Sequence, residues 1–287
     1  MYPPVATNDP AAVQVEVQKA YLSMFPEASP LFVPEAFGWI TECFAGRYQD
    51  YAAIDAHYHD LEHTLQGTLC LARLLYGRHL AGAEPRLTES AFRLGLLGIL
   101  FHDTGYLRKR SDVEGTGAKY TVTHVERSTA FAEQLLLEKG CSKQDIETVQ
   151  NMICCTGLTE SVTSIQFRSE IEKVTGFAVA TADLLGQMAA EDYVDKLPIL
   201  YNEFAEAARF SGDKSHFVAS YLSAEDLIAR TPSFWRDSIR PKLDGEFLGL
   251  CRFLNQPYPS GPNFYLQRIE ANIALVERRL RDEQSVA

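Results

Sequence analysis

A histidine and an aspartate stand next to each other at the end of an almost wholly apolar segment. His102 and Asp103 follow the run LGLLGILF at residues 94–101. A carboxylate is seldom buried unless it is paired or bound to an ion, so one placed here needs a cation or strong hydrogen-bond donors. Because an imidazole lies beside it, a metal ion is the simplest partner. The pair therefore predicts a metal site.

A second motif, YHDLEHT, occupies residues 58–64. His59 and His63 are four residues apart, so on a helix they would project from the same face. There, both imidazoles could bind one ion, or one could bind while the other serves as a proton donor. The motif also matches H-x-x-E-H, a zinc-peptidase signature in which both histidines bind zinc and Glu62 is the base. That alternative leaves His102 and Asp103 unexplained.

A single carboxylate within another apolar segment supplies the last candidate ligand. Residues 176–186, GFAVATADLLG, are apolar nearly all round except at Asp183. Such a carboxylate must be paired, protonated or bound to a metal. The candidate site then offers two nitrogen and two oxygen ligands, a mixture that suits Mn, Mg, Fe or Zn with little selectivity. The four ligands are His63, His102, Asp103 and Asp183.

In this order, the motifs resemble those of the HD-domain superfamily of metal-dependent phosphohydrolases. The first motif is similar to the Tyr-His-Asn-x-x-His form of cyclic-nucleotide phosphodiesterases, with Asp60 in place of the asparagine. The resemblance spans residues 55–190 and implies an enzyme that hydrolyses a small phosphorylated substrate, most closely a nucleotide or cyclic-nucleotide phosphodiester. Asp60 could raise metal affinity and the basicity of His59, or it could weaken binding of an anionic substrate. The substrate within this class therefore stays open.

The resemblance also implies how the chemistry would proceed. A divalent ion held by the four ligands would lower the pKa of a bound water and polarise the phosphoryl oxygen. His59 takes the position of the proton donor to the leaving oxygen. Asp103 would orient the attacking water in addition to binding the metal.

Substrate-binding residues are expected in two further places. The segment 104–122 follows the His-Asp pair directly, is long for a helix connection and contains Arg108, Lys109 and Arg110. These cations are candidates to neutralise the phosphate. Gln187 lies four residues beyond Asp183, on the same helix face, where it would orient the substrate or the groups behind the metal ligands.

Nearly every segment has the apolar periodicity of a helix. Strand signals are confined to the short run YTVT at residues 120–123, and Thr123 with Glu126 has the spacing of a capping box. The sequence therefore predicts an all-α fold, a compact bundle of many helices. Apolar positions recur three and four apart in residues 34–47, 61–77, 88–102, 125–139, 143–155, 170–189, 192–210, 215–230 and 264–281.

We expect three parts along the chain. An N-terminal segment covers residues 1–24, the phosphohydrolase domain covers 25–230, and a helical extension covers 231–287. The extension ends in a run of charged residues that could support a homodimer. A non-catalytic helical binding or scaffold protein of the same fold is the alternative to an enzyme, and metal content would separate the two.

Composition excludes several classes of protein. With 46% hydrophobic and 23% charged residues, the 287-residue chain has the composition of a globular protein. Its formal net charge of -11 disfavours a grip on long nucleic acid, which needs a basic surface. The sequence shows neither a basic and apolar leader nor an apolar run long enough to cross a bilayer, so we expect no membrane association and a cytoplasmic location.

Overall fold

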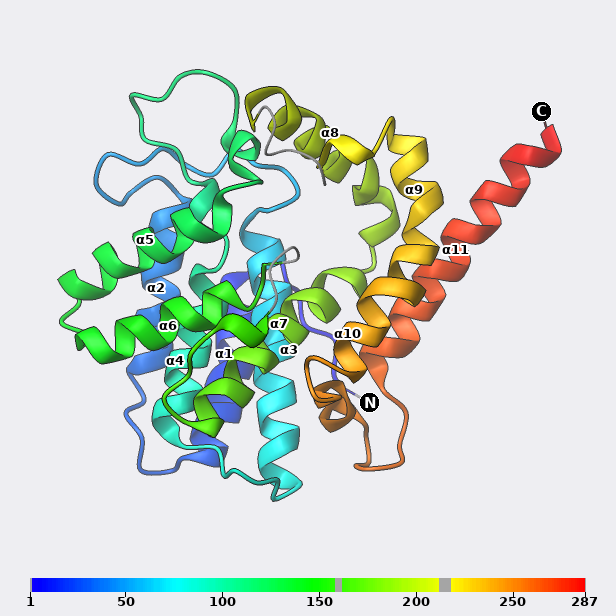
Figure 1. The fold of residues 1–287 in the computed structure, drawn as a ribbon. Coiled ribbons are helices and arrows are strands. Elements are labelled where there is room, and N and C mark those ends of the chain that lie inside the picture. Colours follow the sequence, from blue (N-terminus) through cyan, green and yellow to red (C-terminus); the bar gives the residue numbers. More distant parts are fainter. Residues whose placement is uncertain (1, 158–161, 212–217, 287) are drawn as a thin grey trace.

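The computed structural model describes residues 2–157, 162–211 and 218–286. Helices make up the architecture, and within these ranges no strand is present, only two isolated bridges, Tyr51 with Lys109 and Asn255 with Asn263. The predicted all-α fold is therefore confirmed (Figure 1). None of the described helices combines the length and the apolar composition that a membrane span requires.

The first half of the bundle is built around a long central helix, α3. Helix α1 packs against both α2 and α3, while α4 packs against α3. Sequence periodicity missed α1, although Asp9 caps it and Pro10 opens it. Its buried face carries Val13, Val17 and Tyr21 at four-residue spacing. The bounds are α1 Pro10–Met24, α2 Phe32–Phe44, α3 Leu61–Leu80 and α4 Glu89–Phe101.

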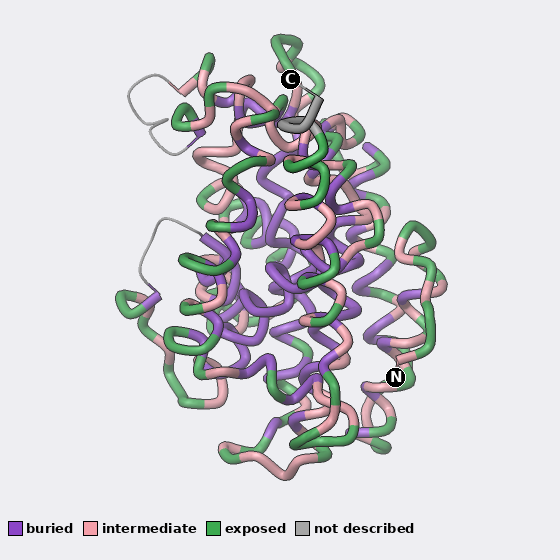
Figure 2. Tube along the Cα trace, turned by 90° about the vertical axis from the view of Figure 1, so that its right-hand side faces the viewer, coloured by how far each residue is buried: buried purple, intermediate pink, exposed green. Residues whose placement is uncertain are grey.

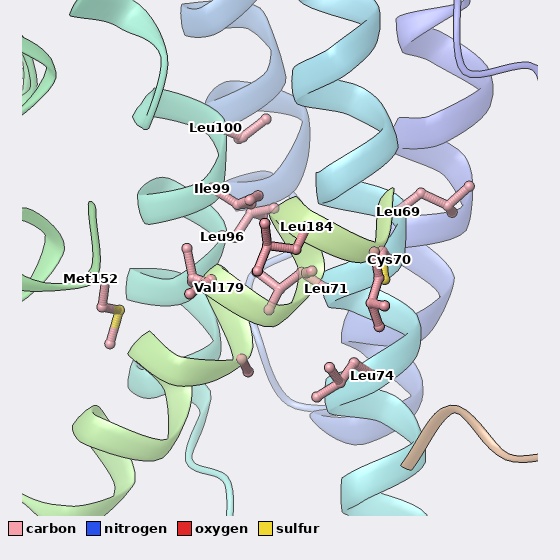
Figure 3. Close-up of a cluster of buried hydrophobic side chains, with 14 of the residues drawn as sticks. Leu69, Cys70, Leu71, Leu74, Leu96, Ile99, Leu100, Met152, Val179 and Leu184 are labelled. Carbon is pink, nitrogen blue, oxygen red and sulfur yellow. The ribbon is translucent and has the colours of Figure 1, made fainter. Parts of the chain in front are cut away.

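The middle of the chain closes the core from the other side. Helix α7 packs against α3, α4 and α6, and α5 packs against α6. Where α3, α4 and α7 meet, Leu71, Ile99 and Val179 lie close together with other buried apolar side chains (Figure 3). Buried residues occupy the middle of the molecule, and exposed residues lie at its edges (Figure 2). The bounds are α5 His124–Glu138, α6 Lys143–Cys154 and α7 Glu170–Met188.

The segment between α4 and α5 is more ordered than a simple loop. It contains two short 3-10 helices, η1 Thr104–Tyr106 and η2 Gly117–Tyr120. The expected β-like run is wrong, because Tyr120 ends η2 and the next three residues form the turn into α5. A side chain at Gly105 would lie 2.0 Å from the backbone oxygen of His124, so only glycine lets η1 approach α5 this closely.

The C-terminal part packs along one side of this bundle. Helix α8 contacts η2 and α9, and α11 contacts α7, α8 and α9 (Figure 1). The helix expected at 215–230 begins instead at Ala224, capped by Ser223, and residues 212–217 lie outside the described ranges. The bounds are α8 Tyr193–Ser211, η5 Val218–Ser220, α9 Ala224–Ser233, the π-helical turn η6 Phe234–Ile239, α10 Arg240–Asp244, η7 Leu250–Leu254 and α11 Phe264–Val286.

Candidate metal centre

Four buried side chains converge where α3, α4 and α7 meet. His63, His102 and Asp103 place ligand atoms within 4.8 Å of one another and could hold a metal ion. Asp103 Oδ2 lies 3.1 Å from His63 Nε2 and 3.2 Å from His102 Nε2. Asp183 Oδ1 lies 3.3 Å from each of the same two nitrogens. The structure thus brings all four predicted ligands together.

Helix termini position three of these ligands. His102 follows the last residue of α4, and Asp103 comes directly after it. His63 lies in the first turn of α3, where the Asp60 side chain caps the helix by accepting a hydrogen bond from His63 N at 2.9 Å. Asp60 is therefore engaged as an N-cap. His59 precedes this helix, which begins at Leu61 as the periodicity predicted, so the two histidines do not project from one helix face.

A close crossing of α3 and α7 places the fourth ligand. A Cβ atom added to Gly186 would lie 2.7 Å from the backbone nitrogen of Gly67, closer than real Cβ atoms approach their neighbours. Gly186 lies three residues after Asp183, and Gly67 lies four residues after His63. Contact between the two backbones at the glycine therefore sets the separation of the two ligands.

The orientation of the histidine rings fits a cation. His102 Nδ1 lies 2.8 Å from the backbone oxygen of Ile99, an acceptor, so Nδ1 carries the proton and a neutral ring presents a lone pair at Nε2. That Nε2 atom and Asp103 Oδ2 are both buried and lack a well-formed hydrogen bond among the described residues. In the neutral ring this lone pair faces carboxylate oxygens, which is repulsive unless a proton or a metal ion lies between them. The donor set therefore fits a divalent metal.

The acidic residues also control protonation of these rings. Burial lowers the pKa of His63, but its contacts with Asp103 and Asp183 and their charges outweigh burial and raise it to about 10. Burial likewise opposes charging of His102, and the same two carboxylates raise its pKa overall. For Asp183, burial favours the neutral form, but the charge of His102 and contacts with both histidines hold its pKa below the ordinary value. A metal must therefore displace protons when it binds near neutral pH.

Glu203, which sequence reasoning missed, holds His59 beside the cluster. Its Oε2 lies 2.6 Å from His59 Nδ1, and Oε1 accepts a hydrogen bond from Tyr58 N at 2.7 Å. Burial raises the pKa of Glu203, but the charge of His59 and its hydrogen bond more than offset this and leave the pKa lowered. A sequence signal existed: Glu203 shares an apolar helix face with Leu200 and Ala207, the same pattern that identified Asp183.

Aromatic rings fix the position of His59 from another side. Tyr106 stacks on His59 with ring centroids 4.4 Å apart and planes 9° apart. His124 stacks on Tyr106 in turn, with ring centroids 5.0 Å apart. His124 Nδ1 lies 2.6 Å from the backbone oxygen of Thr121, and Nε2 lies 3.8 Å from Asp103 Oδ1. The His59 imidazole is thus held on one face by a ring and at Nδ1 by a carboxylate.

Gln187 connects the ligand Asp183 to the first motif. Its Nε2 donates to Asp183 Oδ1 at 3.2 Å, and its Oε1 accepts from the Tyr58 hydroxyl at 3.0 Å. Gln187 also lines the cavity described below. In this arrangement, the amide orients the carboxylate that faces both histidines.

The three basic residues expected to bind phosphate lie elsewhere. Arg108 pairs with Asp55, the Lys109 amine lies 2.6 Å from an Asp50 carboxylate oxygen, and Arg110 donates to a backbone oxygen at 2.6 Å. None of the three lines the cavity beside the metal ligands. Their partners belong to the segment between α2 and α3, so these cations join that segment to the one that precedes η2.

The structure also bears on the peptidase alternative. Glu62 accepts a hydrogen bond from Thr7 Oγ1 at 3.0 Å and lies 3.4 Å from the Lys196 amine. It does not line the cavity, and His59 precedes the helix that carries His63. In this arrangement, Glu62 is not placed to act as a base beside an ion bound by the two histidines.

A cavity of about 680 Å³ opens from the metal cluster. The predicted ligands and His59 lie at one end, and residues from α5, α7, α8 and α9 form the walls. The volume is that of an ordinary small-molecule site.

Glu126 is among the residues that line the cavity. The expected capping box is wrong, because Thr123 makes no side-chain cap bond and its hydroxyl donates to the backbone oxygen of Tyr120.

Comparison with known proteins finds similarity to one family over part of the chain. No curated protein matches the chain. A family model described as Npun_R2479-like matches residues 110–252, just under half of the chain. The matched region contains His124, Asp183 and Glu203 but neither of the two histidine motifs that precede it. Over this region the chain is similar to the Npun_R2479-like family, whose description names no activity.

Proposed function

We propose that this protein is a metal-dependent hydrolase of phosphoesters. The observation that carries the proposal is the convergence of two histidine Nε2 atoms and two carboxylates in the lining of a cavity, with His59 beside them. The order of the motifs, which resembles the HD-domain superfamily, supports the same conclusion. We expect the substrate to be a nucleotide or another small phosphoester.

A bound divalent ion would supply a Lewis acid for the phosphoryl oxygen and a water of lowered pKa. His63, His102, Asp103 and Asp183 would hold this ion, and Gln187 keeps Asp183 in place. In the hydrolysis, a bond forms between the water oxygen and phosphorus while the ester P–O bond breaks. The water loses a proton to solvent, and no oxidant or reductant is needed.

His59 would donate the proton that the leaving oxygen requires. Since Glu203 occupies Nδ1, the transferable proton is the one on Nε2. The carboxylate holds the ring through Nδ1 and leaves Nε2 available to the substrate. Stacking on Tyr106 limits rotation of the ring, so the proton is held in one direction.

Metal analysis and a substrate panel test the proposal. The purified protein should contain or take up a divalent ion by elemental analysis, and it should hydrolyse members of a panel of phosphomonoesters and phosphodiesters with Mn²⁺, Mg²⁺, Fe²⁺ or Zn²⁺. Asp103→Ala should remove both properties, whereas Glu62→Gln should retain them, because Glu62 does not line the cavity.

Three results would count against this proposal. Hydrolysis unaffected by Asp103→Ala would show that the cluster is not the reaction centre. Metal binding without hydrolysis of any panel member would favour the alternative of a non-catalytic binding protein. Peptidase activity that is lost in Glu62→Gln would restore the H-x-x-E-H interpretation.

A further inference from the structure

The lining of the cavity has two chemically different parts. One is the metal cluster with its histidines and carboxylates, and the other is an apolar wall. This wall combines side chains from α7, α8 and α9, three helices that meet only in the folded protein. The apolar side chains that matter here are Leu184, Met188, Leu197, Leu200, Phe204 and Leu227.

Lysine and arginine are absent from the described lining of this cavity. The acidic side chains that line it are Asp103, Asp183 and Glu126, and the described lining groups able to carry positive charge are the histidines His59, His63, His102 and His124. Cations on neighbouring elements are already engaged. Lys196 contacts Asp192 at 3.0 Å and Glu62 at 3.4 Å, and Arg127 donates to two backbone oxygens of the η1 segment at 2.7 and 2.8 Å.

This distribution limits the charge that a ligand can carry. One phosphoryl group at the cluster would face the metal and the histidines. A second anionic group against the apolar wall would find no lysine or arginine among the described lining residues to offset its loss of hydration. An uncharged apolar group in the same place would gain affinity, by about fourfold for each methylene removed from water.

We propose that the substrate is a phosphoester with one phosphoryl group and a large, uncharged, mainly apolar body. This inference rests on the proposed function, because it assigns the phosphoryl group to the metal cluster. It also narrows the substrate class: the described lining offers a polyphosphorylated nucleotide no lysine or arginine for its further phosphates, and the body contacts the wall built by α8 and α9. Specificity then comes from the C-terminal half of the chain, while the chemistry comes mainly from the N-terminal half.

Binding of n-alkylphosphonates tests the inference without turnover, since their C–P bond is not hydrolysed by the proposed reaction. Calorimetry with the Mn²⁺-loaded full-length protein would compare butyl-, hexyl- and octylphosphonate. We expect the dissociation constant to fall about fourfold per methylene. 8-Phosphonooctanoate, which carries a carboxylate at the far end of a similar chain, should bind at least tenfold more weakly than octylphosphonate. Equal binding across the series, or tighter binding of 8-phosphonooctanoate, would overturn the inference.

A charge placed in the wall provides an independent check. Leu200 is half-buried, so a lysine there can reach both the cavity and solvent. In Leu200→Lys, the gain per methylene should shrink and the penalty for the terminal carboxylate should fall severalfold. Leu80→Lys, at a residue 67% exposed and outside the cavity, is the matched control and should behave as the native protein. An unchanged preference in a folded Leu200→Lys protein would contradict the proposed wall.

The same ligands separate this inference from the proposed function. If affinity rises with chain length but the protein hydrolyses no alkyl phosphate, the ligand class stands and the hydrolase proposal fails. If the protein hydrolyses phosphoesters and its KM does not depend on the apolar body, the hydrolase proposal stands and this inference fails.

Discussion

Gly186 offers a direct way to disturb the metal site without touching a ligand. It lies where α7 crosses α3, and a Cβ atom there would be 2.7 Å from Gly67 N and from Gln66 C. Ordinary van der Waals contact begins near 3.4 Å, so in Gly186→Ala the two helices must separate by roughly 0.7 Å. The obstacle is backbone, so it cannot be relieved by a change of rotamer.

This separation has a larger effect on the ligands than on the fold. Metal sites tolerate deviations of about 0.2 Å in ligand position, so a shift of Asp183 relative to His63 should weaken Mn²⁺ binding about 10- to 100-fold. Overpacking costs about 1–3 kcal/mol of stability, and replacing a helical glycine by alanine returns roughly 1 kcal/mol. The net loss in the metal-free protein should therefore be on the order of 1 kcal/mol.

Calorimetric Mn²⁺ titration and urea unfolding of the metal-free protein would measure both quantities. Gly38→Ala is the matched control, because Gly38 is an exposed helical residue and a Cβ atom there would meet nothing within 4 Å. The control should gain about 0.5–1 kcal/mol and keep its metal affinity. If Gly186→Ala binds Mn²⁺ as tightly as the native protein, backbone contact at this crossing does not set the geometry of the ligands.

Three further predictions concern capping, proton transfer and pH. Asp60→Asn should keep the α3 N-cap and change unfolding free energy by only a few tenths of a kcal/mol, whereas Asp60→Ala should cost about 1 kcal/mol in urea titrations; equal losses in both would contradict the capping role. Glu203→Gln should lower kcat on the order of 10²-fold with little change in KM, because His59 Nδ1 loses the carboxylate that holds the ring; an unchanged kcat, or a loss confined to KM, would exclude Glu203 as the positioning residue. Because burial is outweighed by Asp103 and Asp183, the pKa of His63 rises from 6.5 to about 10, so its stabilising contribution to the metal-free protein is complete below pH 6.5 and is lost as pH rises toward 10. The same protonation means that Mn²⁺ affinity should increase with pH and that binding should release protons, measurable by calorimetry in buffers of different ionisation enthalpy; binding without proton release would mean that the histidines are neutral in the free protein.

Local sequence patterns predicted most of the helices. Apolar residues three and four apart identified most helices to within a few residues, since a helix buries one face along its own length. The same reasoning identified the metal ligands. Asp103 and Asp183 are recognisable because each is a charged residue in an apolar segment. The apolar neighbours in the sequence show that the segment is buried, and therefore that the charge is buried with it.

The sequence could not show which charged side chains form ion pairs or hydrogen bonds with residues distant in the chain. Arg108 in a glycine-containing segment suggested a phosphate clamp, but its partner Asp55 is 53 residues away in the chain. Glu203 bonds His59 across 144 residues, so its role depends on how α8 packs against the start of α3. No periodicity in either segment encodes such a contact.

The sequence by itself determined the all-α class, which follows from short-range periodicity, and it predicted the four candidate metal ligands, two of which stand out by the cost of burying charge. Tertiary structure decided the rest. The α3–α7 crossing at Gly186 set the distance between His63 and Asp183, and the packing of α8 and α9 built the apolar wall of the cavity that these residues line. These features arise from close contact between helices far apart in the chain, where backbone shape and side-chain volume act together.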